Sequence, residues 1–195
     1  MSVAPMHIVH TEASRGWGGQ EIRVLTEAEG MIRRGHRVTL LCPPDARILA
    51  EAGLRNVPVA VLPIGRKRLR GILAVYRWLK ANPVDVVNTH SSTDTWLVAL
   101  AALLLKNPPP LVRTRHISAP IPKNLPTRWL YQRATAHIVT TGESLRQQLA
   151  VENGYDPATI TSVPTGIDTG HFAPGDKSAS RAQLGLDPSA LVIGI

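Results

Sequence analysis

The chain has 195 residues, of which 44% are hydrophobic and 18% are charged, a composition that excludes a disordered basic tail and indicates a folded globular protein. Its length allows one substantial core, or one domain with the beginning of another, but not two full domains. The 22 Lys and Arg residues outnumber the 14 Asp and Glu residues and give a net charge of +8, which favours anionic partners such as nucleic acid, phosphorylated metabolites or an acidic membrane surface.

Short runs rich in Val, Ile and Leu alternate with amphipathic segments along the chain. These runs predict strands at residues 6–11, 37–42, 57–62, 84–89, 111–115, 137–141 and 160–163. Helical patterns between most of them favour a Rossmann-like α/β fold, an open parallel sheet of about seven strands with helices on both faces. Ligands of such sheets bind beyond the carboxyl ends of the strands, so a site is expected in the loops that follow the strands.

Apolar stripes and local end signals mark the helices. The first helix is expected to begin near Gly19 and to end before Gly35. Later helices are predicted at residues 45–53, 71–81, 93–106 and 144–154. Asp45 is expected to cap the first of these later helices, and Ser144 with Gln147 to form a capping box at the last.

The pattern changes after Val163, where a stretch with proline and glycine is typical of a linker. The last residues, 191–195, are apolar and begin like another buried strand. We therefore expect residues 1–163 to form one domain, 164–188 an interdomain linker and 189–195 the start of a truncated second domain. On this interpretation the sequence is a fragment.

Gly16, Gly18 and Gly19 precede the first predicted helix. A dinucleotide-binding fingerprint would need a third glycine at position 21, which is Glu21, and an acidic residue at the end of the second strand, which is missing. An NAD site is therefore disfavoured, and no P-loop lysine follows. The glycines leave backbone N–H groups uncovered at a helix start, where phosphate binds favourably. A simple glycine turn packed by Trp17 is the alternative.

Histidine and arginine side chains end the fourth and fifth predicted strands. His90 is a candidate ligand contact, with a helix-capping cluster and an incidental histidine as the alternative. Arg113 and Arg115 project to the same side by strand alternation, and His116 follows them. Two guanidinium groups can bind an anion, and an imidazole beside them can hold or pass a proton near neutral pH. Structural pairing of the arginines with acidic neighbours is the alternative. The proline-containing loop at residues 117–126 is expected to bind a ligand.

The sixth predicted strand is followed by Thr141 and Glu143. Both are candidate contacts for ligand hydroxyls, although helix capping explains the hydroxyl side chains equally well. The histidines and the single cysteine lack the spacing of a metal site, and no Gly-x-Ser-x-Gly elbow occurs. We therefore predict neither a metal site nor a serine hydrolase.

Arg66, Lys67, Arg68 and Arg70 form a basic run ahead of an amphipathic predicted helix that carries aromatic residues. Such a combination suits an acidic membrane surface. A solvated charge run beside an ordinary core-facing helix is the alternative. Nucleic acid is disfavoured, because aromatic residues are few and no binding motif accompanies the charge.

The sequence contains no obvious export or membrane-spanning signal. The N-terminus lacks the features of a signal peptide, and the longest apolar run, residues 96–105, is about half the length needed to cross a bilayer. The single cysteine, Cys42, excludes an internal disulfide and fits a reducing compartment. A cytoplasmic protein, peripheral at the inner membrane face, is therefore expected.

The chain resembles the N-terminal half of family-4 glycosyltransferases, which have the GT-B fold. The resemblance runs from about residue 6 to residue 174, and it lies in five segments that occur in the family's order: GGQEIRVL, RGHRVTLLCPP, the His116 loop, VTTGESLRQQL and ITSVPTGIDTGHFAP. Bacterial members that extend lipopolysaccharide or related surface glycans look most similar.

This resemblance implies an enzyme of hexosyltransferase type that moves a sugar, with retention, from a nucleotide-sugar donor to a hydroxyl of a glycan or glycolipid acceptor. No obligatory metal or other cofactor is implied. The resemblance places Gly18 and Gly19 near the donor diphosphate or the acceptor, and His116 near the reacting sugar, with Arg115 as a charge contact.

The resemblance also implies that the family's donor-binding glutamates and basic residues belong to a second domain, which this sequence does not reach. We therefore expect the 195 residues alone to be inactive. A stand-alone α/β module that binds a phosphorylated ligand or an acidic membrane surface without catalysis is the alternative. A dinucleotide-dependent oxidoreductase is a third interpretation, weakened by Glu21.

Overall fold

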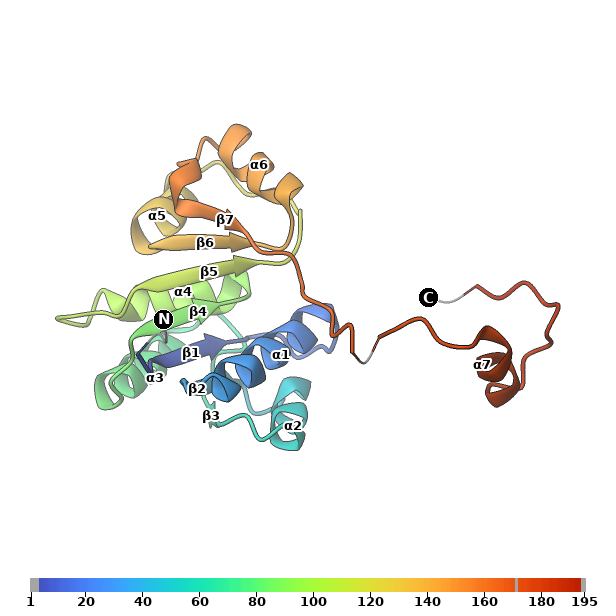
Figure 1. Ribbon diagram of the computed structural model, residues 1–195. Helices are drawn as coiled ribbons and strands as arrows, with labels where there is room; N and C mark the ends of the chain where they lie inside the picture. Colours follow the sequence, from blue (N-terminus) through green and yellow to red (C-terminus); the bar gives the residue numbers. More distant parts are fainter. Residues whose placement is uncertain (1–3, 171, 194–195) are drawn as a thin grey trace. The chain divides into compact units, whose positions relative to one another are not determined.

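The computed structural model describes residues 4–170 and 172–193. Within these residues the chain forms a seven-stranded sheet in the order β3-β2-β1-β4-β5-β6-β7, and every neighbouring pair of strands is parallel (Figure 1). The strands are β1 (His7–Thr11), β2 (Arg37–Cys42), β3 (Val59–Val61), β4 (Val86–Thr89), β5 (Leu111–Arg115), β6 (His137–Thr140) and β7 (Ile160–Ser162). The predicted Rossmann-like α/β class is confirmed.

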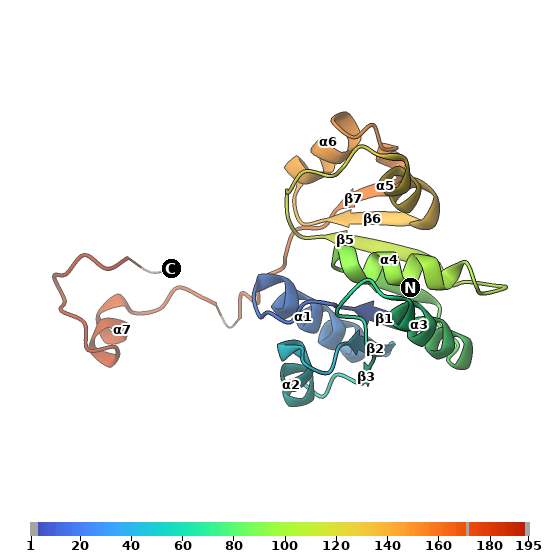
Figure 2. The same cartoon turned by 180° about the vertical axis from the view of Figure 1, so that it is seen from behind.

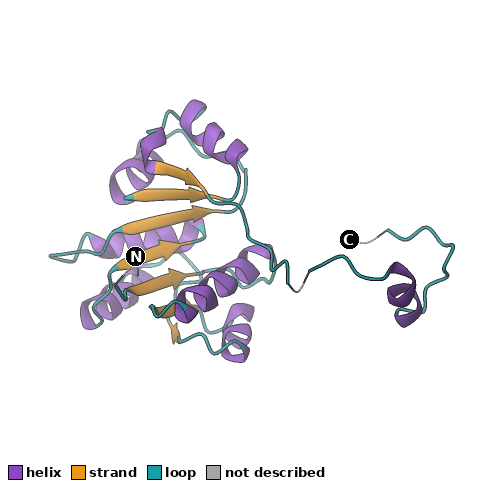
Figure 3. Cartoon of the chain, viewed as in Figure 1, coloured by secondary structure: helices purple, strands orange, loops and turns teal. Residues whose placement is uncertain are grey.

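Helices lie on both faces of this sheet. They are α1 (Gly19–Arg33), α2 (Arg47–Leu54), α3 (Leu69–Ala81), α4 (Ser92–Ala102), α5 (Leu125–Trp129) and α6 (Glu143–Val151), with a π-helical turn η1 (Leu130–Ala134) and a 3-10 turn η2 (Pro157–Thr159). Figures 1 and 2 show α1 across one face and α3 with α4 across the other, and Figure 3 shows how strands and helices alternate. This arrangement follows from the topology, because parallel strands are joined only by crossover connections.

Two apolar clusters hold the layers together, and strand alternation sends neighbouring residues to different clusters. Ile8 and Leu40 belong to the cluster that includes α1 and α2, whereas Val9 and Leu41 belong to the cluster that includes α3 and α4. Burying each such aliphatic side chain contributes about 1.5–3 kcal/mol. Burial on both faces explains why the strands read as continuous apolar runs.

Several predicted boundaries shift. β3 is confined to three residues, and α3 begins two residues before the predicted Gly71. α4 ends at Ala102 instead of Lys106, and the leucines at positions 103 and 104 turn outward, 66% and 54% exposed. The apolar run therefore extends beyond the end of the helix, because the chain must leave the helical conformation before the prolines that follow.

Both capping predictions are wrong. Ala46 is the N-cap of α2 and makes no side-chain bond, whereas Asp45 forms an ion pair with Arg15 at 2.8 Å. α6 begins at Glu143 behind Gly142, and no side chain caps it. The capping box lies at α4 instead, where the Ser91 side chain and the Asp94 side chain bond each other's backbone N–H groups.

The chain divides between Pro164 and Thr165 into two compact units. The second unit contains α7 (Lys177–Gln183), whose start is capped by the Asp176 side chain through bonds to two backbone N–H groups. Residues 191–193 have no regular structure, and residues 194 and 195 of the expected strand lie outside the described residues. The proposed division into domain, linker and truncated second domain stays a prediction.

Candidate functional site

Three histidines meet where the central strands end. His10 belongs to β1, His90 follows β4 and His116 follows β5, and these three strands are neighbours in the sheet. His10 Nδ1 lies 2.8 Å from His90 Nε2, and His90 Nδ1 lies 3.0 Å from His116 Nε2. We call these residues the histidine chain. It begins in the core at His10 and ends at the partly exposed His116.

All three imidazoles are neutral at physiological pH. Burial lowers the pKa of His10 to about 4 and the pKa of His90 well below its usual value. Burial, assisted by the positive charges of Arg23 and Arg113, lowers the pKa of His116 to about 4. A neutral imidazole has one donor and one acceptor nitrogen, so the two hydrogen bonds must run in the same direction along the chain.

The two ends of the histidine chain differ. His10 Nε2 is buried and has no hydrogen-bond partner in the described part of the chain, so neither bond direction is favoured by that atom. His116 Nδ1 is outside both hydrogen bonds and lies at the partly exposed end. It can therefore act as a donor or an acceptor toward a ligand, depending on the direction of the bonds behind it.

A buried carboxylate supports the loop that carries His90. Asp94 accepts hydrogen bonds from the Thr11 hydroxyl at 2.6 Å, from the His90 backbone N–H at 3.0 Å and from Ser91. Burial raises the pKa of Asp94, and these donors oppose that rise. The bonds tie the end of β1 to the start of α4 and fix the backbone of the central histidine.

A second buried carboxyl group, Glu12, follows β1. It accepts hydrogen bonds from the Ser14 backbone N–H at 2.8 Å and from the Gln20 side chain. Burial and the negative charge of Asp94 raise the pKa of Glu12 to about 8. Glu12 is therefore largely protonated at neutral pH, and it links the strand end to the first turn of α1.

The glycine loop lies on the same edge and places Gly18 at the N-cap of α1. Gly18 has an extended backbone with φ of −170°, which any residue adopts. A Cβ at Gly19 would meet no other atom of the described residues within 4 Å, and one at Gly18 would meet only Glu21 Oε2, at 3.7 Å. Neither backbone strain nor packing explains these glycines, whereas close approach of a ligand would.

Two charged residues of α1 are buried against the site, and the sequence pattern did not predict them. Glu21 and Arg23 are 6% and 4% exposed, while the apolar Ile22 between them is 42% exposed. Arg23 donates to Glu27 at 2.6 Å and to the Val163 carbonyl at 2.9 Å. Helical periodicity assigns charged residues to the solvent face. Only the departure of these two buried charges from the apolar stripe of the helix could have revealed them in the sequence.

Arg113 and Arg115 lie on one side of β5, as predicted, and both contact Tyr131. The Arg113 guanidinium carbon lies 4.8 Å from the ring centroid, and Arg115 Nη1 lies 3.2 Å from the phenolic oxygen. Arg113 also donates to Thr95, and Arg115 donates to the carbonyl of Ala119 in the loop that follows His116. In the described residues neither forms an ion pair with a carboxylate, although the positive charge of Arg113 acts to lower the pKa of the buried Asp94.

The remaining candidates lie apart from the histidine chain. Glu143 pairs with Arg146 at 2.6 Å, and hydrogen bonding to that guanidinium lowers the pKa of Glu143. Thr141 belongs to the same β6–α6 loop. No hydrogen bond or ion pair joins either residue to the histidines over residues 4–170 and 172–193. No group of three or more metal-ligating side chains is arranged in those residues to hold a metal ion.

The basic run is divided between two places. Lys67 Nζ lies 3.1 Å from the Ser92 hydroxyl and 5.9 Å from the ring centroid of Trp96, beside the start of α4. The arginines at positions 66, 68 and 70 line a separate pocket. None of the helices within the described ranges has the length and apolar composition needed to cross a bilayer, and membrane contact by the basic run stays a prediction.

Comparison with known proteins identifies similar sequences for most of the chain. The profile of Glycosyltransferase Family 4 matches residues 17–171, a range that contains the glycine loop, His90 and His116. Two relatives bear the name D-inositol 3-phosphate glycosyltransferase. The one from Actinosynnema mirum is 29% identical over 90% of this chain and 49% of its own length; the one from Segniliparus rotundus is 34% identical over 90% and 45%.

Solved structures show the same fold. The Anabaena protein HepE, solved in complex with UDP-glucose, aligns with a TM-score of 0.71 and 19% identity over 92% of this chain and 50% of its own. A glycosyltransferase from Rickettsia africae aligns with a TM-score of 0.72 and 15% identity over 96% and 51%. The chain thus spans about half the length of each of these relatives and structures.

Proposed function

The chain belongs to glycosyltransferase family 4, and from this premise we propose that it is the acceptor-side domain of an enzyme that transfers a sugar, with retention, from a nucleotide-sugar donor to an acceptor hydroxyl. The observation that carries the proposal is the histidine chain, which ends in a partly exposed imidazole at the carboxyl edge of the sheet. In open α/β sheets this edge is where ligands bind.

His116 is the residue we assign to the reacting sugar. Its Nε2 is bonded to His90, which leaves Nδ1 to face a ligand hydroxyl or ring oxygen. Because burial keeps the imidazole neutral, it interacts with the sugar as a hydrogen-bond partner without adding positive charge. His10 and His90 act as positioning residues, since their bonds fix the orientation of the His116 ring.

The donor is proposed to be a nucleotide sugar. HepE, a structural neighbour of the chain, has been solved with UDP-glucose and with UDP, which supports this class of donor. Gly18 and Gly19 are proposed to let the backbone amides at the start of α1 approach the donor diphosphate or the acceptor, since helix N-termini favour anions. No metal or other cofactor is assigned a role, and Arg115, Thr141 and Glu143 stay proposed ligand contacts.

Two acceptor classes have support. A glycan or glycolipid of the bacterial surface, such as lipopolysaccharide, is supported by the sequence resemblance described above. A phosphorylated polyol is supported by the names of the relatives in Actinosynnema mirum and Segniliparus rotundus. For the first class, we also propose that the protein is cytoplasmic and lies at the inner membrane face, where the basic run contacts acidic lipids.

The 195 residues alone are proposed to be inactive, because they span only about half the length of the named relatives. The alternative is a module that binds a phosphorylated ligand or a membrane surface without catalysis. A donor and acceptor screen on the full-length protein, meaning these residues with any continuation that the gene encodes, separates the two. Transfer to one acceptor class supports the enzyme. Binding without transfer for every donor and acceptor supports the module.

A further inference from the structure

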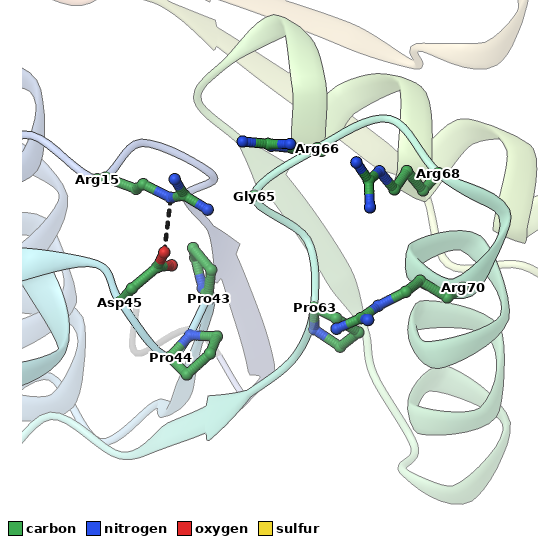
Figure 4. A pocket seen from close by; sticks show the side chains of 9 residues that line it. All are labelled: Arg15, Pro43, Pro44, Asp45, Pro63, Gly65, Arg66, Arg68 and Arg70. Atoms are coloured by element: carbon green, nitrogen blue, oxygen red, sulfur yellow. Dashed lines mark ion pairs between the residues drawn. The ribbon is translucent and has the colours of Figure 1, made fainter.

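A pocket of about 290 Å³ lies at the carboxyl edge of the sheet, on the side of β2 and β3. Three loops form it: the β1–α1 loop with Arg15, the β2–α2 loop with Pro43, and the β3–α3 loop with Pro63 and Gly65 (Figure 4). It shares no lining residue with the histidine chain. The pocket is therefore a second concave feature on the ligand-binding edge of the fold.

The charge of the pocket is strongly positive. Arg15, Arg66, Arg68 and Arg70 line it together with one carboxylate, Asp45. Asp45 is paired with Arg15 at 2.8 Å. The other three guanidinium groups form no hydrogen bond or ion pair within the part of the chain that the structure describes. All three side chains are exposed, so water screens their mutual repulsion and their N–H groups are available to bond an anion that enters the pocket.

The wall of the pocket is rigid and closely packed. Prolines follow both β2 and β3, and each fixes its own backbone φ. A Cβ at Gly65 would lie 3.4 Å from Pro43 Cβ, so the two loops touch at that glycine. Figure 4 shows Arg68 and Arg70 extending from the start of α3 toward the loop of Pro63 and Gly65, with the Arg15–Asp45 pair on the opposite side. The guanidinium groups thus surround a preformed hollow.

We propose that this pocket binds a phosphate group, with Arg66, Arg68 and Arg70 as its ligands. Guanidinium forks match the oxygens of a phosphate and bond them in pairs, which a solvated lysine run does not do. Asp45 holds Arg15 back and limits the charge offered to the anion. The phosphate belongs to a soluble phosphorylated compound or to a lipid headgroup, and the pocket recognises the chemistry that the two share. This binding does not depend on the transferase reaction.

The test uses the 195-residue chain and titration calorimetry with inorganic phosphate and pyrophosphate. The variant R66Q/R68Q/R70Q removes three pocket charges. The matched control, R33Q/R77Q/R133Q, removes three exposed arginines outside the pocket, one of them on α3 itself. We expect the pocket variant to lose about tenfold or more in affinity for pyrophosphate and the control to lose less than about threefold. Urea unfolding checks that both variants fold.

Three further arms sharpen the result. Replacing the same three arginines by lysine keeps the charge and removes the fork, so we expect an intermediate affinity. Asp45→Asn releases Arg15, and we expect tighter pyrophosphate binding, a gain that a folding defect would not produce. Co-sedimentation with phosphatidylcholine vesicles, with and without phosphatidylglycerol, identifies the source of the phosphate. If the pocket variant loses vesicle binding, the control variant keeps it, and pyrophosphate binding shows no such difference, the phosphate belongs to a lipid headgroup.

Equal losses in the pocket variant and the control, in both the pyrophosphate and the vesicle arms, would overturn the proposal, because general surface charge would then explain binding. Absence of any binding by the wild-type chain in both arms would also overturn it. Neither result bears on sugar transfer, which is measured separately on the full-length protein with the pocket intact.

Discussion

His116 is the residue on which the proposed chemistry depends, and its titration reports its surroundings. Burial and nearby positive charge lower its pKa to about 4, whereas an exposed histidine titrates near 6.5. We expect the His116 ring nitrogens, followed by ¹⁵N NMR of the labelled chain, to stay neutral down to about pH 5. A midpoint near 6.5 for His116 would show that the histidine chain is not formed.

Substitution of Gly19 distinguishes a simple glycine turn from a loop that contacts a ligand. An alanine there meets no neighbour within 4 Å among the described residues, and alanine favours a helix over glycine by up to about 1 kcal/mol. We therefore expect Gly19→Ala to keep or slightly raise the free energy of unfolding. In the full-length protein we expect the same change to weaken donor or acceptor binding, measured as a rise in KM. Unchanged KM with unchanged stability would leave the glycine without a ligand role.

The sequence alone could not have placed the histidine chain. His10, His90 and His116 are far apart in the sequence, and they meet only because β4 lies between β1 and β5 in the sheet. The sequence identified His90 and His116 from their positions at strand ends. It overlooked His10, because a histidine inside an apolar strand carries no local signal that it bonds to a residue at the end of the neighbouring strand.

Helix α1 is the element that links the edge of the sheet to the glycine loop. Arg23 joins this helix to the carbonyl of Val163, just past β7, and pairs with Glu27 one turn further along the same helix. We expect Arg23→Gln to lower the free energy of unfolding by about 2–3 kcal/mol, because it removes the charge-assisted hydrogen bonds that a buried guanidinium makes to Glu27 and Val163. Arg33→Gln, exposed on the same helix, should change it by less than about 0.5 kcal/mol. Urea denaturation measures both, and equal effects would contradict the structural role of Arg23.

At the scale of elements, periodicity predicted the order and type of nearly every strand and helix. Apolar strand runs were reliable because both faces of the sheet are buried. Helix ends were less reliable, because Asp45 bonds to Arg15 and Glu143 bonds to Arg146, and such competing partners lie outside the local pattern. The burial of Arg23 escaped prediction for a related reason, because its bond to the Val163 carbonyl joins segments that are far apart in the sequence.

The whole molecule should show a stability maximum near pH 6.5. The lowered pKa values of His10, His90 and His116 mean that the unfolded chain binds more protons between about 4 and 6.5, so stability rises with pH there. The raised pKa of Glu12 means that the folded chain binds more protons than the unfolded chain from about pH 4.5 to about pH 8. The histidines outweigh this effect below pH 6.5, and above it stability falls by at most about 2 kcal/mol up to pH 8.

The variant Glu12→Gln isolates the second of these effects. It keeps the shape of the side chain and removes the titration, so we expect the decline between pH 6.5 and 8 to disappear while the rise below 6.5 remains. Urea unfolding across this range measures both limbs. A decline that persists in the variant would assign the effect to another group.

Sugar transfer by the full-length protein tests the central claim, that His116 at the end of the histidine chain serves the reaction of a glycosyltransferase. We expect the wild type to transfer sugar from a nucleotide-sugar donor, and His116→Ala to reduce kcat by about 100-fold or more with little change in the thermal unfolding midpoint. Turnover by His116→Ala at the wild-type rate would contradict the claim.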